Sequence, residues 1–358
     1  MTNKIPTYIF GSAKTQPVAM IHVGSTVALQ NTAYNKLLHI ETYSIKDMDV
    51  LRNIRLELYK LHAKVIEEYA IPYLEQCKSS VFLLEEKEIA KLEEQLKSLL
   101  FIENLINRAI KETEIYINNG ISMISVENFG APYFMGEQVP FEELLVLNIV
   151  AKTLRTKFPN IPMGIHVLSS DELESLPIAI AARACFIRSE ATVFEGHRPE
   201  GRTENKGTLA KLFYLRNFFQ TTLGVENPEE RLYPKVWSDL QKKHTVFEQE
   251  LSSLSTWLNN LMFMKLEGII LTGMETGSDV AEKDLQMGRE AVEKLREQTK
   301  KYFGKSLQIP LVAGSGMDVK MYKKYADFII TGTQLKQNKY WENEVSEGNV
   351  KALVKNFS

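Results

Sequence analysis

The chain has 358 residues, a length that suits one large α/β barrel or two ordinary domains. Its 43 basic and 45 acidic residues give a formal net charge of -2, so no overall positive field would draw it to nucleic acid or an anionic bilayer. Two cysteines are too few for a disulfide framework and fit a reducing compartment. Residues 1–20 lack the apolar core of a secretion signal, and no stretch reaches the roughly 18 apolar residues that span a bilayer. We expect a cytoplasmic globular protein with no integral membrane segment and no nucleic-acid partner.

Short apolar segments rich in β-branched residues alternate with longer amphipathic segments. The strand-like segments are 18–23, 121–126, 161–168, 184–189, 233–240, 267–273, 310–314 and 327–332. The helix-like segments include 141–158, 171–184, 206–223, 280–303 and 317–326. Eight such units are typical of a closed parallel barrel. We predict a single (β/α)8 TIM barrel over residues 1–358; an open doubly wound sheet is the alternative.

The interval between the first two strands is about three times longer than one strand-helix unit needs. Residues 45–80 and 84–118 both show helical periodicity with dense Glu and Lys between the apolar positions. We predict a helical hairpin insertion over residues 41–105. It would cap the barrel, form an oligomer interface or make peripheral contact with a membrane surface. We expect the protein to be a homo-oligomer.

Polar residues follow most of the predicted strands, at the end of a parallel barrel where active sites lie. Glu127 and Asp239 are the candidates for acid or base, because burial can bring the pKa of a carboxyl toward neutrality. Arg188 would neutralise developing negative charge. The other catalytic candidates are His166, Lys243 and His244, and the substrate-binding candidates are His22, Asn128, Glu190, Arg202 and Thr272. The alternative for each acid is an ion pair with Arg188, Arg202 or Lys243.

A divalent metal is a further alternative for this mouth. Its ligands would be His22, His166, Asp239 and His244, since imidazole and carboxylate groups suit such ions. Their spacing matches no local metal signature. We therefore predict no cofactor and assign no metal ligand.

Two glycine-bearing turns, GSG and TGT, follow the last two predicted strands. The loops after strands seven and eight of such barrels frequently hold a phosphate on backbone N–H groups, and glycine lets the backbone approach an anion. We predict phosphate binding by Gly314, Ser315, Gly316, Gly332 and Thr333. Plain turns are the alternative.

The segment 195–207, EGHRPEGRTENKG, is long, charged and interrupted by glycines. Such a loop suits a mobile lid, and Arg198 and Arg202 would then close on a substrate anion. A solvated loop without a role is the alternative.

Several motifs together resemble the BtpA family of barrel proteins. They are MIHVG (20–24), VENFGAPYF (126–134), IPMGIHVLSSD (161–171), FIRSEA (186–191), EGIILTGMETG (267–277), and VAGSGMD with ADFIITGTQLK (312–336). The resemblance implies a single (β/α)8 barrel. It links the founding members to accumulation of photosystem I proteins at thylakoid membranes, whereas other relatives resemble enzymes and carry labels such as phosphoribosylanthranilate isomerase.

The chain departs from the family pattern at two predicted strand ends. Similar proteins usually have VNVLRND where this chain has IHVLSSD, so His166 stands in place of an asparagine. They tend to have RVNV where this chain has RSEA, which puts Glu190 at the mouth. We predict an enzyme that acts on a small phosphorylated sugar or nucleotide derivative by acid/base chemistry. The alternative is a non-catalytic assembly factor that binds a partner through the insertion.

Overall fold

The described part of the chain covers the strands of the barrel and helices around them. The computed structural model describes residues 15–23, 53, 91, 100–128, 139, 141–168, 172–190, 196–198, 201–203, 208–222, 234–240, 246, 254–264, 266–273, 279–304, 309–314, 319–340 and 343–357. Most of the predicted insertion lies outside these residues, so the roles predicted for it stay predictions. Lys243, His244, Ser315 and Gly316 also lie outside these residues, and their predicted roles stay predictions.

Eight parallel strands close into a barrel, as predicted. They are β1 (Gln16–His22), β2 (Met123–Glu127), β3 (Met163–His166), β4 (Phe186–Ser189), β7 (Lys235–Asp239), β8 (Ile269–Leu271), β9 (Leu311–Ala313) and β10 (Phe328–Thr331). Each pairs with the next one in this order, and β10 pairs with β1 to close the ring. All eight strand-like segments of the sequence therefore form the barrel in chain order.

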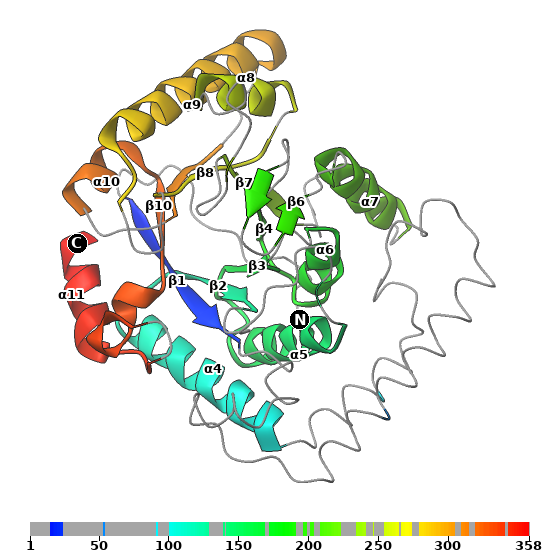
Figure 1. The fold of residues 1–358 in the computed structure, drawn as a ribbon, viewed down its shortest axis with the longest axis vertical. Helices are drawn as coiled ribbons and strands as arrows, with labels where there is room; N and C mark the ends of the chain where they lie inside the picture. Colours follow the sequence, from blue (N-terminus) through cyan, green and yellow to red (C-terminus); the bar gives the residue numbers. More distant parts are fainter. Residues whose placement is uncertain are drawn as a thin grey trace.

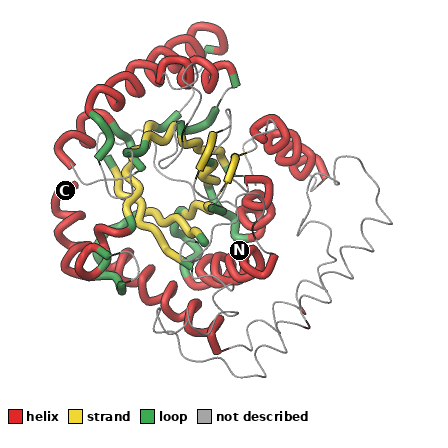
Figure 2. The backbone as a smooth tube through the Cα atoms, viewed as in Figure 1, coloured by secondary structure: helices red, strands yellow, loops and turns green. Residues whose placement is uncertain are grey.

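Helices surround the ring of strands (Figures 1 and 2). They are α4 (Leu100–Asn118), α5 (Phe141–Lys157), α6 (Glu172–Ala181), α7 (Thr208–Thr222), α8 (Leu254–Phe263), α9 (Glu282–Phe303), α10 (Val319–Tyr325) and α11 (Glu347–Phe357). Helix α4 matches the second half of the predicted helix 84–118. Among the described helices, none combines the length and apolar composition that a membrane crossing requires.

Part of the predicted lid is a short hairpin. Strands β5 (Gly196–Arg198) and β6 (Gly201–Thr203) pair antiparallel between β4 and α7. The backbones of His197 and Val246 exchange two hydrogen bonds of 2.8 Å each, which attach the hairpin to the chain that follows β7. This segment therefore has regular backbone pairing where the sequence indicated only a loop.

Side chains alternate between two apolar environments because successive residues of a strand point to opposite faces. Ala19 and Ile21 of β1 belong to the large cluster packed between strands and helices, whereas Val18 and Met20 belong to a second cluster inside the barrel. His22 continues the inward series of β1. Inward positions near the C-terminal strand ends thus carry the polar residues.

Aromatic side chains fill the barrel interior below these strand ends. The rings of Phe186 and Trp237 stack with centroids 3.9 Å apart, and Phe328 lies 5.3 Å from Trp237. Glycines provide the space: a Cβ at Gly164 would lie 2.1 Å from the Phe186 ring, and one at Gly268 would lie 2.2 Å from Trp237. We call this packed layer the barrel floor.

Candidate active site

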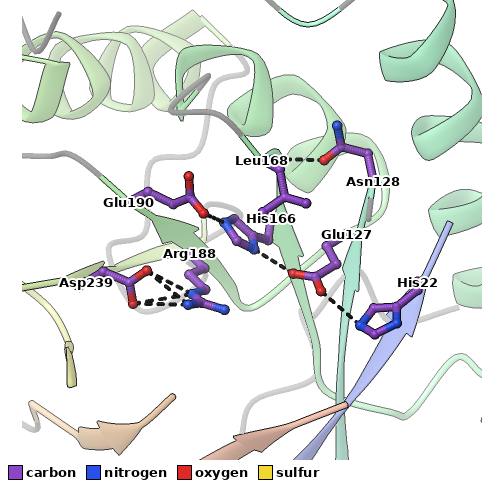
Figure 3. A network of polar contacts seen from close by, with 8 residues as sticks. All are labelled: His22, Glu127, Asn128, His166, Leu168, Arg188, Glu190 and Asp239. Carbon is purple, nitrogen blue, oxygen red and sulfur yellow. Dashed lines mark hydrogen bonds and ion pairs between the residues drawn. The ribbon is translucent and has the colours of Figure 1, made fainter. Parts of the chain in front are cut away.

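The strand register brings three predicted site residues together at the mouth. Glu127 is the register partner of His22 on one neighbouring strand and of His166 on the other. Residues at the same level of adjacent parallel strands point the same way, so all three side chains project into the barrel mouth (Figure 3). The strand register therefore explains why Glu127 contacts both His22 and His166.

A chain of polar contacts runs through these residues from β1 to the end of β4. His22 Nε2 lies 3.0 Å from Glu127 Oε1, and His166 Nδ1 lies 2.7 Å from Glu127 Oε2. On the other side of its ring, His166 Nε2 lies 3.1 Å from Glu190 Oε1. That contact is an ion-pair contact, and His166 Nε2 makes no hydrogen bond to the described residues. We call His22, Glu127, His166 and Glu190 the mouth chain.

Glu127, His166 and Glu190 of the mouth chain are buried, and contacts within the chain shift the pKa values of Glu127 and His166. Burial alone would raise the pKa of Glu127, but hydrogen bonds from His166 and His22 outweigh it and hold this pKa well below its usual range. Burial and Arg188 would lower the pKa of His166, but Glu127 and Glu190 outweigh them and raise it above 6.5. A neutral imidazole has one N–H, so a ring between two carboxylates favours the doubly protonated form.

Arg188 and Asp239 form a separate buried ion pair beside the mouth chain. Arg188 donates from Nε and Nη2 to both oxygens of Asp239, over 3.0 to 3.4 Å. Burial would lower the pKa of Arg188, but Asp239, Glu127 and Glu190 outweigh it and raise this pKa. The ion-pair alternative is thus confirmed for Asp239, whereas Glu127 pairs with histidines.

Two predicted substrate-binding residues serve the fold at the same strand ends. The Oδ1 atom of Asn128 accepts a hydrogen bond of 2.7 Å from the backbone N–H of Leu168, which ties the end of β2 to the end of β3. The methyl group of Thr272 lies against Gly314, where a Cβ would be 2.8 Å from Thr272 Cγ2. Neither contact tests substrate binding.

The glycines after β9 and β10 each have a structural reason to lack a side chain. A Cβ at Gly332 would lie 3.0 Å from His22 Nε2, so glycine leaves room for the histidine ring. Gly314 makes the same kind of room for Thr272, and its N–H donates to Leu271 O over 2.7 Å. Thr333 begins the short 3-10 helix η5 (Thr333–Leu335). Phosphate binding at these turns stays a prediction.

Two further predictions concern a metal site at the mouth and the position of Arg202. Within the described ranges, no three His, Cys, Asp or Glu side chains are arranged to hold a metal ion. His244 lies outside those ranges. Arg202 lies on β6 opposite His197, and only its backbone is described.

The sequence identified all four residues of the mouth chain as site candidates. It did not show which of them contact one another. Strand ends were located from apolar runs, and strand parity could have shown that His22, Glu127 and His166 all face inward. Which inward residues touch depends on register between strands far apart in sequence. The one described cysteine, Cys185, lies within the barrel, where burial raises its pKa to about 12.

The chain is similar to proteins from archaea and animals. An uncharacterized protein of Pyrococcus abyssi is 28% identical over 253 residues, covering 68% of this chain and 83% of the relative. An uncharacterized mitochondrial protein of Caenorhabditis elegans is 23% identical over 262 residues, covering 71% and 84%.

Solved structures also show a distant likeness. Phosphoribosylanthranilate isomerase from Thermotoga maritima has a TM-score of 0.41 at 8% identity, covering 69% of this chain and 92% of that one. Dihydropteroate synthase from Xanthomonas albilineans has a TM-score of 0.41 at 13% identity, covering 72% and 86%. These low scores carry no argument about function. The BtpA family, in contrast, matches residues 94–358, and the chain belongs to this family.

Proposed function

We propose that the protein is an enzyme that acts on a small phosphorylated substrate, a sugar or nucleotide derivative, by acid/base chemistry at the C-terminal mouth of its barrel. The observation that carries the proposal is the mouth chain, in which two imidazoles alternate with two carboxylates in a buried site. Groups of these types exchange protons near neutral pH when their surroundings shift their pKa values. Arg188 adds a fixed positive charge beside them.

The contacts of each side chain suggest its role. Glu127 is held ionised by two histidines, so it orients both rings by accepting a hydrogen bond from each. Asp239 holds two nitrogens of Arg188, whose third nitrogen, Nη1, points away from Asp239 (Figure 3). A guanidinium fixed in this way is suited to stabilise an oxyanion that forms on a substrate.

The phosphate part of the proposal rests on the ends of β9 and β10. Strand β10 is the neighbour of β1, and its Gly332 lies against the ring of His22. A phosphate at the turn after β10 would therefore lie beside one end of the mouth chain. That placement would anchor one end of a substrate while the reacting end meets the polar groups.

Ligand screening of the full chain tests the proposal. Thermal unfolding is measured with phosphorylated sugars and nucleotides and with the unphosphorylated form of each as the matched control. A ligand at 100 times its Kd stabilises the folded state by about 2.7 kcal/mol, a measurable rise in Tm. We expect stabilisation by a phosphorylated compound only, followed by its conversion on incubation.

Two variants connect binding to chemistry. Glu127→Gln keeps the shape of the side chain but removes the charge that holds both histidines, so it should bind the compound and convert it at least about 100-fold more slowly. Glu297→Gln makes the same change on the exposed face of α9 and should convert it normally. Equal stabilisation by both forms of every compound, or full activity of Glu127→Gln, would contradict the proposal.

A further inference from the structure

A buried ion pair outside the mouth chain lies between helix α4 and the segment that follows β10. The ammonium nitrogen of Lys336 lies 2.5 Å from Oε1 of Glu112 on α4, and the two side chains are 0% and 4% exposed. Glu112 lies one helical turn before Tyr116, whose buried side chain donates a hydrogen bond of 3.1 Å to the backbone oxygen of Met20 on β1. The pair therefore lies on the face of α4 that packs against the barrel wall.

The polar groups of this pair are only partly satisfied by their surroundings. Arg108 Nε also contacts Oε1 of Glu112, over 3.2 Å, whereas Oε2 of Glu112 is buried and makes no hydrogen bond to the described residues. Burial lowers the pKa of Lys336 below its ordinary value, and Glu112 offsets this effect only in part. Apolar side chains of similar volume often stabilise a fold at least as well as a buried ion pair does. Stability alone therefore does not explain why two charges lie here.

Residues 332–336, which we call the β10 turn, connect this ion pair to the barrel mouth. The backbone N–H of Lys336 donates to Thr333 O over 3.1 Å, and the N–H of Leu335 donates to the oxygen of the first residue of the turn over 2.9 Å. That first residue is Gly332, where a Cβ would lie 3.0 Å from His22 Nε2. A shift of Lys336 would therefore move the backbone that lies against His22.

Helix α4 contacts the segment after β10 at further positions, which differ from the Lys336 contact in kind. Arg108 Nη2 donates to the backbone oxygen of Asn343 over 3.1 Å. Lys111 Nζ lies 3.0 Å from Glu344 Oε2, but these side chains are 62% and 63% exposed, and exposed pairs contribute little. The Lys336 contact is buried and joins two full charges at a defined distance, whereas apolar contacts are non-directional. It is therefore suited to fix the position of the β10 turn.

We propose that Lys336 and Glu112 are positioning residues of the barrel mouth. By joining α4 to the β10 turn, they fix Gly332 and the backbone that receives the substrate phosphate in the function proposed above. The inference rests on that function and adds two residues that act through the turn. A displacement of about 1 Å at the turn would weaken substrate binding, because bound geometry is sensitive to misplacement on this scale.

A variant without either charge separates positioning from stability. In Lys336→Met the Glu112 carboxylate stays buried without its ammonium partner, and the urea midpoint of the full chain should fall by about 1 M. In the apolar double variant, Lys336→Met with Glu112→Leu, the midpoint should return to within about 0.3 M of the wild type. The matched control is Lys111→Met with Glu344→Leu, which removes the exposed pair between the same helix and the same segment.

Hydrogen exchange of the full chain measures whether the β10 turn is fixed, without a substrate. The amide hydrogens of Leu335 and Lys336 close the turn, and their exchange is followed by NMR or mass spectrometry. We expect them to exchange at least about 10-fold faster in the apolar double variant, even though its urea midpoint has recovered. The control should exchange at the wild-type rate. A wild-type rate in the apolar double variant would overturn the proposal.

Kinetics on the phosphorylated compound found by screening test the effect on the site. KM should rise by about 10-fold in the apolar double variant while kcat changes by less than about 2-fold, because substrate binding is weakened and the reacting groups are unchanged. A wild-type KM would show that the pair serves only the fold, and it would overturn the inference while leaving the proposed function standing. If no phosphorylated compound binds, the proposed function fails, and hydrogen exchange alone decides whether the pair fixes the turn.

A second variant replaces the apolar double variant if that protein does not fold. Glu112→Gln keeps the shape of the side chain and one acceptor oxygen but removes the charge that holds Lys336. Faster exchange of the β10 turn and a raised KM are expected here too. Wild-type values of either quantity would overturn the proposal.

Discussion

The barrel interior has an apolar level, the floor, and a charged level, the mouth. At the floor, Phe186, Trp237 and Phe328 stack against one another, and glycines at neighbouring positions make room for the rings. At the mouth, inward positions at the C-terminal ends of the barrel strands carry carboxylates, imidazoles and a guanidinium. The floor maximises buried apolar contact, which stabilises folds. The mouth buries charges, which costs free energy unless every charge is paired.

This difference shows which level holds the fold together and which serves function. Phe186 and Arg188 lie two residues apart on β4, and Trp237 and Asp239 lie two residues apart on β7. Each strand therefore presents one packing residue and one charged residue to the interior. Apolar residues would fill the mouth at least as stably, so the charged ones need another reason to be there.

The largest expected effect is at the floor, on replacement of Trp237 by alanine. The side chain is fully buried and stacked, and such truncations lower the free energy of unfolding by about 3 to 5 kcal/mol. Urea denaturation measures the change. Tyr214→Ala truncates an aromatic residue that is 60% exposed and should change the free energy by less than about 0.5 kcal/mol. Similar losses from both variants would show that the floor does not contribute more to the free energy of unfolding than an exposed aromatic residue.

A smaller loss is expected at the mouth when one member of the Arg188–Asp239 pair is removed. Arg188→Met leaves the Asp239 carboxylate buried without its partner, and we expect the free energy of unfolding to fall by about 3 kcal/mol. The double variant Arg188→Met and Asp239→Leu removes both charges and should recover to within about 1 kcal/mol of the wild type. If the double variant stays as unstable as the single one, the pair serves the fold rather than the site.

The fold could be predicted from sequence more completely than the site, for a physical reason. Each strand appears as a local apolar run and each helix as a local periodicity, so eight units indicate a closed barrel. The site depends on which inward residue faces which, and that depends on register across the ring. Glu127 and Arg188 both point inward and carry opposite charges, yet Glu127 meets the histidines of the two adjacent strands while Arg188 meets Asp239. Charge alone predicts the wrong partner for Glu127.

Gly332→Ala adds a single methyl group beside His22 at the mouth. The new Cβ would lie 3.0 Å from His22 Nε2 and 3.2 Å from Met20 Cβ, so the histidine ring must shift by a few tenths of an ångström. We expect a loss of about 1 to 2 kcal/mol by urea denaturation and a changed His22 NMR signal. Gly348→Ala on α11 places its Cβ no closer than 3.7 Å to Ser346 Oγ and should be neutral or slightly stabilising. An unchanged His22 signal in Gly332→Ala would show that the His22 ring does not need the space that Gly332 leaves.

The smallest expected effect concerns how the stability of the mouth depends on pH. The pKa of His166 is raised above 6.5 in the folded protein, so its contribution is fully present below the unfolded value and is lost as the pH rises through the folded value. The free energy of unfolding should therefore decline above about pH 6.5, and His166→Asn should remove most of that decline. His197→Asn makes the same substitution on the exposed face of β5 and should leave most of it in place. The comparison is made by urea denaturation at several pH values. A decline of equal size in wild type and His166→Asn would mean that the ring between Glu127 and Glu190 does not hold an extra proton, and the mouth would then be paired less completely than its geometry indicates.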